Sequence, residues 1–136
     1  MLRAVLDTNT FVSAVIAKGN ESELLLAAHR GDFKIVTSLE ILKEFKGVIS
    51  RPKFSFSKEQ IQNVLLHIIE AAEIVQPNIR LDIVKEDPDD NKVIECAVFS
   101  KADFIVSGDK HLLKLKKVNG ITVIKSAELL NKIRKP

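Results

Sequence analysis

The sequence predicts an α/β protein built on a parallel β-sheet, and two features of the chain support that class. Short apolar runs alternate with longer segments in which apolar residues recur with the 3.6-residue period of a helix, which is typical of βαβ construction. The 136 residues are 46% hydrophobic and 29% charged, so the chain is too apolar for disorder and long enough to bury a core. We expect one domain that spans residues 1–136.

The predicted elements follow one another without a linker or an internal repeat. Patterns in which a small polar residue stands three positions before Glu or Gln begin helices at 20–23, 37–40 and 57–60. An acid, a proline and two further acids begin another helix at 87–90, and the aperiodic residues 78–86 are expected to form a connection. In chain order we expect a strand over 4–6, helices over 8–16 and 20–30, a strand over 33–36, helices over 37–49 and 57–72, a strand at 74–75, a helix from 87, strands over 104–106 and 121–124, and a helix over 126–133.

Charge is distributed unevenly along the chain. The overall balance is +3, but residues 1–100 carry 12 basic and 15 acidic side chains, whereas residues 101–136 carry 9 and 3. A balance of +3 is compatible with an anionic partner but is too small to establish one. The single cysteine, Cys96, excludes an internal disulfide and a cysteine-based zinc site. Because the N-terminus lacks an apolar leader and no run of 18 apolar residues occurs, we expect a cytoplasmic protein with no membrane span.

Four acidic residues stand at the ends of predicted strands or near the starts of predicted helices. Asp7 follows the first strand, Asp109 follows the fourth, Asp90 lies in the first turn of a helix and Glu44 lies one turn inside another. The carboxyl ends of parallel strands and the helix starts that follow them share one edge of the sheet, so the three Asp are expected to converge. Glu44 lies four residues after Glu40 on the same helix face, so one of these two is expected to look toward that edge. Carboxylates that converge repel one another unless a cation binds or their pKa values rise. Oxygen ligands without an expected His or Cys partner favour Mg²⁺ or Mn²⁺.

Each acid also has a structural interpretation. Asp90 and Asp109 are residues that favour helix starts, and Glu44 is of a type that usually lies on a solvated helix face. Asp7 is harder to explain in this way, because it directly follows a strand buried on both faces. The three histidines, His111 among them, show no catalytic or metal-ligand spacing, and we expect all three to be structural or solvated.

Four short motifs stand in order along the chain. Asp7-Thr8-Asn9 follows the first strand, Glu44 lies on a helix, and Asp90 precedes an apolar helix. The fourth motif is Ser107-Gly108-Asp109. In this order and on these elements the motifs resemble those of the PIN-domain ribonucleases, in particular the VapC-like toxins of prokaryotic toxin–antitoxin pairs. Residues 51–54 resemble a run found in one subgroup. The chain departs from the family pattern at position 107, where the family has Thr and this chain keeps only the hydroxyl as Ser.

The resemblance implies an α/β/α sandwich with a five-stranded parallel sheet and an acidic pocket that holds one or two Mg²⁺ or Mn²⁺ ions and cleaves RNA. It implies that Asp7, Glu44, Asp90 and Asp109 are the catalytic, metal-holding residues, with Asp89 as an alternative to Asp90. A cognate antitoxin protein and a homodimer are expected on the same ground.

Further residues are expected to assist the acids. Thr8, Asn9 and Ser107 are assigned to orienting ligands and water or contacting phosphate. Basic side chains that flank the acids are assigned to holding the RNA backbone, with an ordinary solvated face as the alternative for the lysine run. These basic residues are Arg51, Lys53, Lys110, Lys114, Lys116 and Lys117.

Three other functions compete with a toxin nuclease. One is a catalytically inert PIN-like module that binds RNA or protein, and another is an RNA-processing nuclease without an antitoxin. A phosphatase with an Asp nucleophile would need an acid where this chain has Asn9, and a phospho-acceptor receiver would need one near Val75. The last class is therefore disfavoured.

Overall fold

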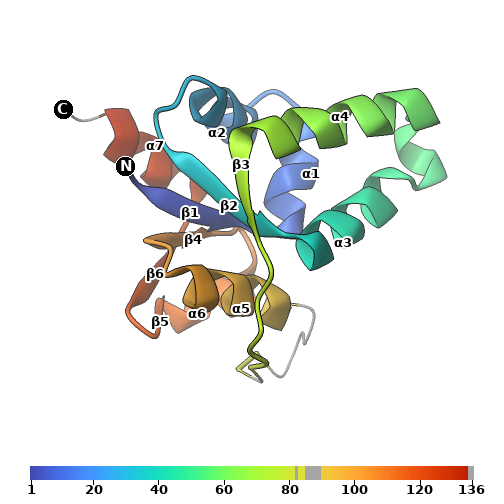
Figure 1. Cartoon of the computed structure of the whole chain (residues 1–136). Coiled ribbons are helices and arrows are strands. Elements are labelled where there is room, and N and C mark those ends of the chain that lie inside the picture. The colour runs from blue at the N-terminus through green and yellow to red at the C-terminus, as the bar shows by residue number, and fades with distance from the viewer. Residues whose placement is uncertain (82, 85–89, 135–136) are drawn as a thin grey trace.

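The computed structural model describes residues 1–81, 83–84 and 90–134, in which a β-sheet lies between two layers of helices (Figure 1). Helices α5 and α6 cover one face of the sheet and α1, α2 and α7 cover the other, while α3 and α4 extend to one side. The strands are β1 (Arg3–Leu6), β2 (Lys34–Ser38), β3 (Ala72–Val75), β4 (Phe104–Val106), β5 (Lys117–Val118) and β6 (Ile121–Ile124). The helices are α1 (Thr8–Ile16), α2 (Asn20–His29), α3 (Leu39–Ile49), the 3₁₀ turn η1 (Pro52–Phe54), α4 (Lys58–Ala71), α5 (Asn91–Ser100), α6 (Lys110–Leu115) and α7 (Ser126–Arg134).

The five predicted strands are all present and parallel, which confirms the α/β class and the sandwich. The prediction of a five-stranded sheet needs one correction, because the described sheet has six strands in the order β3-β2-β1-β4-β6-β5. The additional strand, β5, pairs antiparallel with β6 across a two-residue turn formed by Asn119 and Gly120. Both turn residues have positive φ, 49° and 82°, which suits the tight turn that Asn-Gly favours. The short helix α6 was also not predicted.

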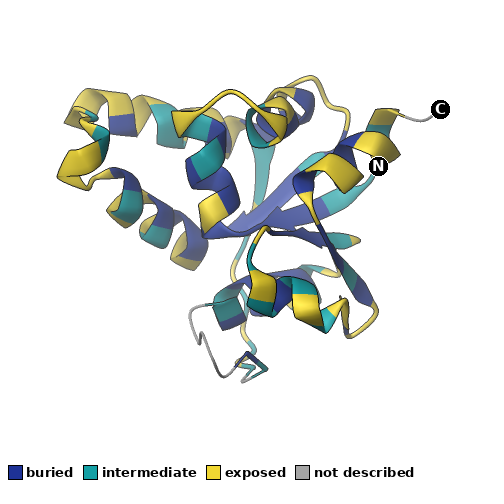
Figure 2. Cartoon of the chain, turned by 180° about the vertical axis from the view of Figure 1, so that it is seen from behind, coloured by how far each residue is buried: buried dark blue, intermediate teal, exposed yellow. Residues whose placement is uncertain are grey.

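The core lies around β1, the strand between β2 and β4. Ala4, Val5 and Leu6 have no exposed surface, and Figure 2 shows the central strands as the most continuously buried part of the fold. The pairing of Leu6 with Val106 brings the carboxyl ends of β1 and β4 side by side. Across the described residues, no helix combines the length and apolar character that a bilayer crossing requires.

The opposite end of β1 is fixed by Arg3. Its guanidinium forms an ion pair with Glu73 of β3, with an Nη2–Oε2 distance of 2.8 Å, and donates to the Ser100 carbonyl at the end of α5 at 2.6 Å. Its backbone N–H donates to Asp103 at 2.8 Å. One side chain thereby ties β1 to β3 and α5 at the end of the sheet far from the predicted acids.

Two predicted helix caps are displaced by one residue. The cap of α2 is Gly19, whose N–H donates to the Ser22 hydroxyl at 2.9 Å, and the cap of α3 is Ser38, which accepts from the Ile41 N–H at 3.3 Å. Thr37 is instead the fully buried fourth residue of β2. The predicted start of the helix at 87–89, and with it Asp89, lies outside the described residues.

The packing of α1 against α3 can be tested at Phe45. Its fully buried ring lies 5.8 Å from that of Phe11, centroid to centroid, and joins the two helices that follow β1 and β2. We expect Phe45→Ala to lower the free energy of unfolding by about 3–5 kcal/mol, because it removes buried contacts and leaves a cavity. Phe99→Ala is the control, because Phe99 is 39% exposed and its loss should cost about 1 kcal/mol or less. Urea denaturation measures both, and equal losses would contradict this account of the core.

Candidate metal centre at the carboxyl edge of the sheet

Asp7 is the most buried of the four predicted acids. It caps α1 directly after β1, is 3% exposed, and accepts a hydrogen bond from the Thr10 N–H at 2.8 Å and another from the Ser107 hydroxyl. Burial raises the pKa of the Asp7 carboxyl, hydrogen bonds from Ser107 and Thr10 oppose this, and the nearby Asp109 carboxylate raises it further. An ionised Asp7 is therefore costly in the folded protein without a cation.

Ser107 connects two of the acids. It is 1% exposed, its hydroxyl donates to Asp7, and the same oxygen accepts from the Asp109 N–H at 2.9 Å. The hydroxyl predicted to orient ligands therefore fixes both the carboxylate after β1 and the backbone after β4.

Asp109 caps α6 and lies beside a histidine. One of its oxygens accepts from the His111 N–H at 2.8 Å and from the Leu112 N–H at 3.2 Å. Ligand atoms of Asp90, Asp109 and His111 lie within 4.8 Å of one another, so the three residues are placed to share a metal ion. Sequence reasoning gave His111 no role in the site, although its position two residues after Asp109 was visible in the sequence.

Glu44 reaches the site from α3. Its carboxylate pairs with Lys92 of α5, with an Oε2–Nζ distance of 2.6 Å. It lines a cavity of about 220 Å³ together with Asp7 and Asp90. The predicted residues Thr8, Asn9 and Arg51 line the same cavity.

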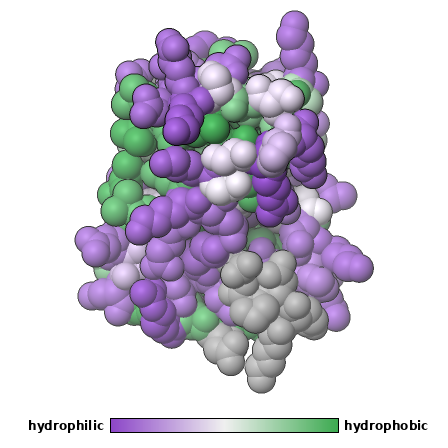
Figure 3. All heavy atoms as spheres, turned by 90° about the vertical axis from the view of Figure 1, so that its right-hand side faces the viewer, coloured by the Kyte–Doolittle hydropathy of each residue, from purple (hydrophilic) through white to green (hydrophobic). Residues whose placement is uncertain are grey.

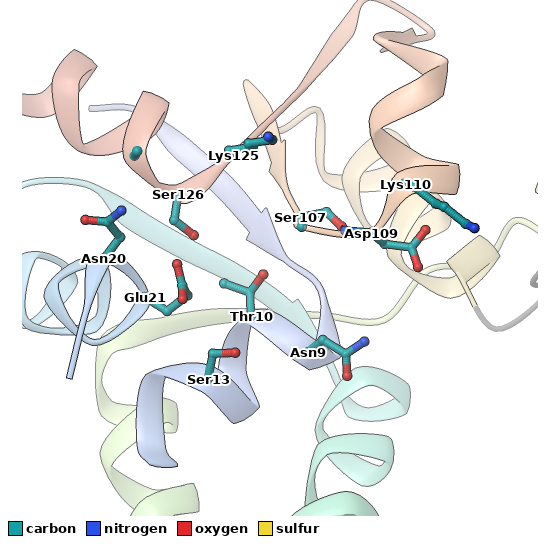
Figure 4. Close-up of a pocket in the computed structure, with 12 residues that line it drawn as sticks. Asn9, Thr10, Ser13, Asn20, Glu21, Ser107, Asp109, Lys110, Lys125 and Ser126 are labelled. Atoms are coloured by element: carbon teal, nitrogen blue, oxygen red, sulfur yellow. The ribbon is translucent and has the colours of Figure 1, made fainter. Parts of the chain in front are cut away.

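A second cavity, of about 630 Å³, adjoins the first at Asn9, which lines both (Figure 4). Three further predicted residues, Ser107, Asp109 and Lys110, line this larger cavity. The predicted acids thus surround two neighbouring cavities at the carboxyl edge of the sheet. Figure 3 views the molecule from this side and shows hydrophilic side chains across much of the face.

Fewer of the predicted basic residues lie beside the acids than the sequence suggested. Lys53 lies in η1 with its ammonium 5.0 Å from the centre of the Phe54 ring, and it lines neither cavity. Lys114 lines a different cavity beside His111. Lys116 and Lys117 lie where the chain leaves α6 and enters β5, which carries them away from the acids. Arg51 and Lys110 are the predicted basic residues that line the two cavities.

The residues present fit a divalent cation. Four carboxylates supply the hard oxygen ligands that Mg²⁺ and Mn²⁺ prefer, and the imidazole of His111 is more suited to Mn²⁺ than to Mg²⁺. The Thr8 hydroxyl, which belongs to the lining of the smaller cavity, is buried without a hydrogen-bond partner among the described residues. A buried hydroxyl without a partner is the kind of group that a bound water or ligand satisfies.

The fold and the acidic edge are those of the PIN domain, and the sequence model of that family matches residues 3–111. The chain belongs to the PIN domain family.

Two solved structures resemble the chain. VapBC2 from Rickettsia felis, solved bound to a DNA fragment from its promoter, is 19% identical, with a TM-score of 0.62 and coverage of 91% of this chain and 98% of that chain. PAE2754 from Pyrobaculum aerophilum is 13% identical, with a TM-score of 0.61 and coverage of 97% and 89%. No curated protein matches the sequence. At these identities the two structures establish the shared fold.

The raised pKa of Asp7 predicts how stability depends on pH. The folded protein holds the Asp7 proton more tightly than the unfolded chain does, so ionisation of Asp7 destabilises the fold as pH rises above its ordinary pKa of 3.8. In metal-free protein we expect Asp7→Asn to raise the urea midpoint at pH 7, and the gain to shrink as the pH is lowered toward 3.8.

Asp32→Asn is the control for this measurement, because Asp32 is an exposed carboxylate paired with Arg30 at 3.2 Å. It should change the midpoint little at either pH. A lower midpoint for Asp7→Asn than for the wild type at pH 7 would contradict the interpretation of Asp7 as a destabilising buried charge.

Proposed function

We propose that this protein is an endoribonuclease that hydrolyses RNA phosphodiester bonds with Mg²⁺ or Mn²⁺, and that it is the toxin of a toxin–antitoxin pair. The observation that carries the proposal is the placement of Asp7, Glu44 and Asp90 around one cavity with Asp109 alongside. Membership of the PIN domain family, whose members are generally metal-dependent nucleases, supports the reaction. The structural likeness to VapBC2 and the sequence motifs of VapC-like toxins support the biological role.

Asp90 is the residue common to both groups of ligands. It lines the cavity with Asp7 and Glu44, and one of its carboxylate oxygens lies within 4.8 Å of the ligand atoms of Asp109 and His111. We assign Asp90 to the shared position of one or two ions, with the other acids on either side. A bound ion would neutralise charge on the scissile phosphate and lower the pKa of a water.

The protein's own groups hold these ligands in position. Ser107 and Thr10 fix the Asp7 carboxylate, and the Asp109 carboxylate is held by two backbone N–H groups of α6. Lys92 neutralises Glu44 until an ion binds, since its ammonium occupies one Glu44 oxygen. Thr8 and Asn9 face the same cavity and are assigned to water or phosphate.

The substrate and partners follow from the surroundings of the site. Arg51 and Lys110 line the two cavities and are assigned to the RNA backbone, which is anionic along its length. The single free cysteine, which is buried, is compatible with the reducing conditions of the cytoplasm. A cognate antitoxin and a homodimer are part of the proposal through the family resemblance.

An inert PIN-like module that binds RNA or protein is the second candidate, and the Glu44–Lys92 pair favours it. A carboxylate already neutralised by a lysine needs no metal to be stable in the folded protein. Calorimetry with Mn²⁺ separates the candidates, because a module of this kind would show no binding.

Substitution of Asp90 tests the nuclease. We expect Asp90→Asn to reduce Mn²⁺-dependent cleavage of RNA by about a hundredfold or more. Asp90 is assigned as a direct ligand of the ion, and its loss should cost more than the loss of a residue that only orients a ligand. The fold should persist, since one repelling charge is removed. Asp32→Asn is the control and should cleave normally.

The same pair of variants tests the toxin role. Induced expression of the wild-type chain in bacteria should arrest growth, whereas Asp90→Asn should not. Cleavage in vitro without growth arrest would indicate RNA processing rather than a toxin, and undiminished cleavage by Asp90→Asn would refute the site assignment.

The two ligand groups around Asp90 can be separated by calorimetry. We expect Glu44→Gln and His111→Gln each to weaken Mn²⁺ binding by about tenfold or more, because each loses one ligand. His67→Gln, an exposed change on α4, should bind as the wild type does. An unchanged titration for His111→Gln would confine the ion to the cavity lined by Asp7, Glu44 and Asp90.

A further inference from the structure

The larger cavity beside the metal centre has polar groups at both of its ends. Its volume of about 630 Å³ lies in the range of small-molecule sites. Ser107 and Asp109 form the end next to the metal centre, and Asn20 and Glu21, at the start of α2, form the other end. Figure 4 shows Lys125, the single residue between β6 and α7, lying between these ends.

We propose that this cavity binds one nucleotide of the RNA next to the cleaved bond, and that Glu21 selects guanine there; the proposal rests on the nuclease function proposed above. The continuity of the cavity with the metal centre carries the first part. Asp109 belongs to the group of candidate metal ligands with Asp90 and His111, and it also lines this cavity. An RNA strand cleaved beside that group would therefore have a neighbouring nucleotide within reach of the cavity.

The carboxylate of Glu21 is not used by the fold. It is half-buried in the cavity wall and has no hydrogen bond or ion pair in the part of the chain that the structure describes. Among the other described acids away from the metal centre, Glu23 pairs with Arg134 and Glu73 with Arg3. Glu59 and Glu70 are also without a partner among the described residues, but they are exposed and do not line the cavity. Glu21 is therefore available to accept hydrogen bonds from a ligand in the cavity.

The chemistry of a carboxylate favours guanine over the other bases. An ionised carboxylate offers only acceptors, and its two oxygens can take two parallel hydrogen bonds. The Watson–Crick edge of guanine presents two adjacent donors, N1–H and the N2 amino group, whereas adenine, cytosine and uracil each place acceptors beside a single donor group. Because no aromatic side chain lines the cavity, stacking cannot supply the selectivity, and recognition falls to this edge.

Lys125 supplies the charge that a nucleotide phosphate needs. Its ammonium has no hydrogen-bond or ion-pair partner among the described residues, and it lies between the metal centre and Glu21. A phosphate contact of this kind strengthens binding without reading the base. Lys125 and Glu21 should therefore have separable effects, the first on all nucleotides and the second on guanine alone.

Binding of the four nucleoside 5′-monophosphates to the full chain in EDTA tests the cavity without cleavage. We expect guanosine monophosphate to bind about tenfold more tightly than the other three, since hydrogen bonds to a charged group are the stronger kind. Glu21→Gln should abolish that preference, and Lys125→Ala should weaken all four by a similar factor. Backbone amide shifts in NMR at 20–21 and 125–127 would locate the nucleotide.

Glu59→Gln is the matched control, because Glu59 is likewise an acid in the first turn of a helix, is exposed and does not line the cavity. It should retain the guanine preference. Equal binding of the four nucleotides, no binding, or a preference that survives in Glu21→Gln would overturn the proposal.

Cleavage of a random-sequence RNA pool with Mn²⁺ separates failure of this proposal from failure of the proposed function. Guanine should be enriched at one position beside the cleaved bond for the wild type and for Glu59→Gln, and not for Glu21→Gln. Cleavage without that enrichment overturns the guanine site. Absence of all cleavage counts against the proposed nuclease function. The mononucleotide titrations alone then show whether the cavity binds guanine preferentially.

Discussion

The hydroxyl of Ser107 is the contact on which the arrangement of the site depends. It donates to the Asp7 carboxylate and accepts from the Asp109 N–H at 2.9 Å, so one atom contacts both the acid after β1 and the backbone of the acid after β4. The register that pairs Leu6 with Val106 makes this contact possible, because residues 7 and 107 then leave the sheet together. A side chain without a hydroxyl at this position would leave Asp7 buried with one oxygen unsatisfied.

The charged residues at the two ends of β1 differ in whether an opposite charge lies beside them. Arg3, at the amino end, is neutralised by Glu73 and held by the Ser100 carbonyl, so its charge is balanced within the fold. Asp7, at the carboxyl end, is more deeply buried and forms no salt bridge among the described residues, and its pKa is raised by burial. In the absence of a cation the raised pKa favours the protonated Asp7 carboxyl, and a cation bound beside it would favour the ionised form.

The sequence predicted those features that depend on local order along the chain. The five parallel strands contain short apolar runs, most completely buried in β1 and least in the edge strand β3, where Ile74 is 40% exposed. Asp7 directly follows β1 and Asp109 lies three residues after β4, which is where the sequence pattern put them. The hairpin at Asn119 and Gly120 was missed although its two residues are typical of a tight turn. The lysines around it predict either a basic flank or an ordinary solvated face, and neither interpretation predicts α6 or β5.

Local sequence patterns did not predict the features that depend on how elements far apart in the chain pack together. The pairing of Glu44 with Lys92 joins α3 to α5 across 48 residues of sequence, and neither helix carries a signal that names the other. His111 lies beside Asp90 and Asp109 because it stands in the first turn of α6, the helix that Asp109 caps, and α6 was not predicted. The sequence therefore predicted the acids and their common edge of the sheet, whereas the pairing of Glu44 with Lys92 and the place of His111 beside Asp90 and Asp109 required the fold.

Asn9 lines both cavities of the site, of which the smaller is suited to holding a metal ion and the larger to binding a ligand. The cavity on one side of Asn9 is lined by Asp7, Glu44 and Asp90, and its charge is mostly negative. The cavity on the other side is lined by two lysines, Lys110 and Lys125, and by two acids, Glu21 and Asp109. Lysines are thus part of the lining of the larger cavity only, whereas Arg51 is the basic residue that lines the smaller one. If an anionic chain binds here, as we propose, the acids would repel it until a cation offsets their charge, so its binding would be coupled to that of the metal.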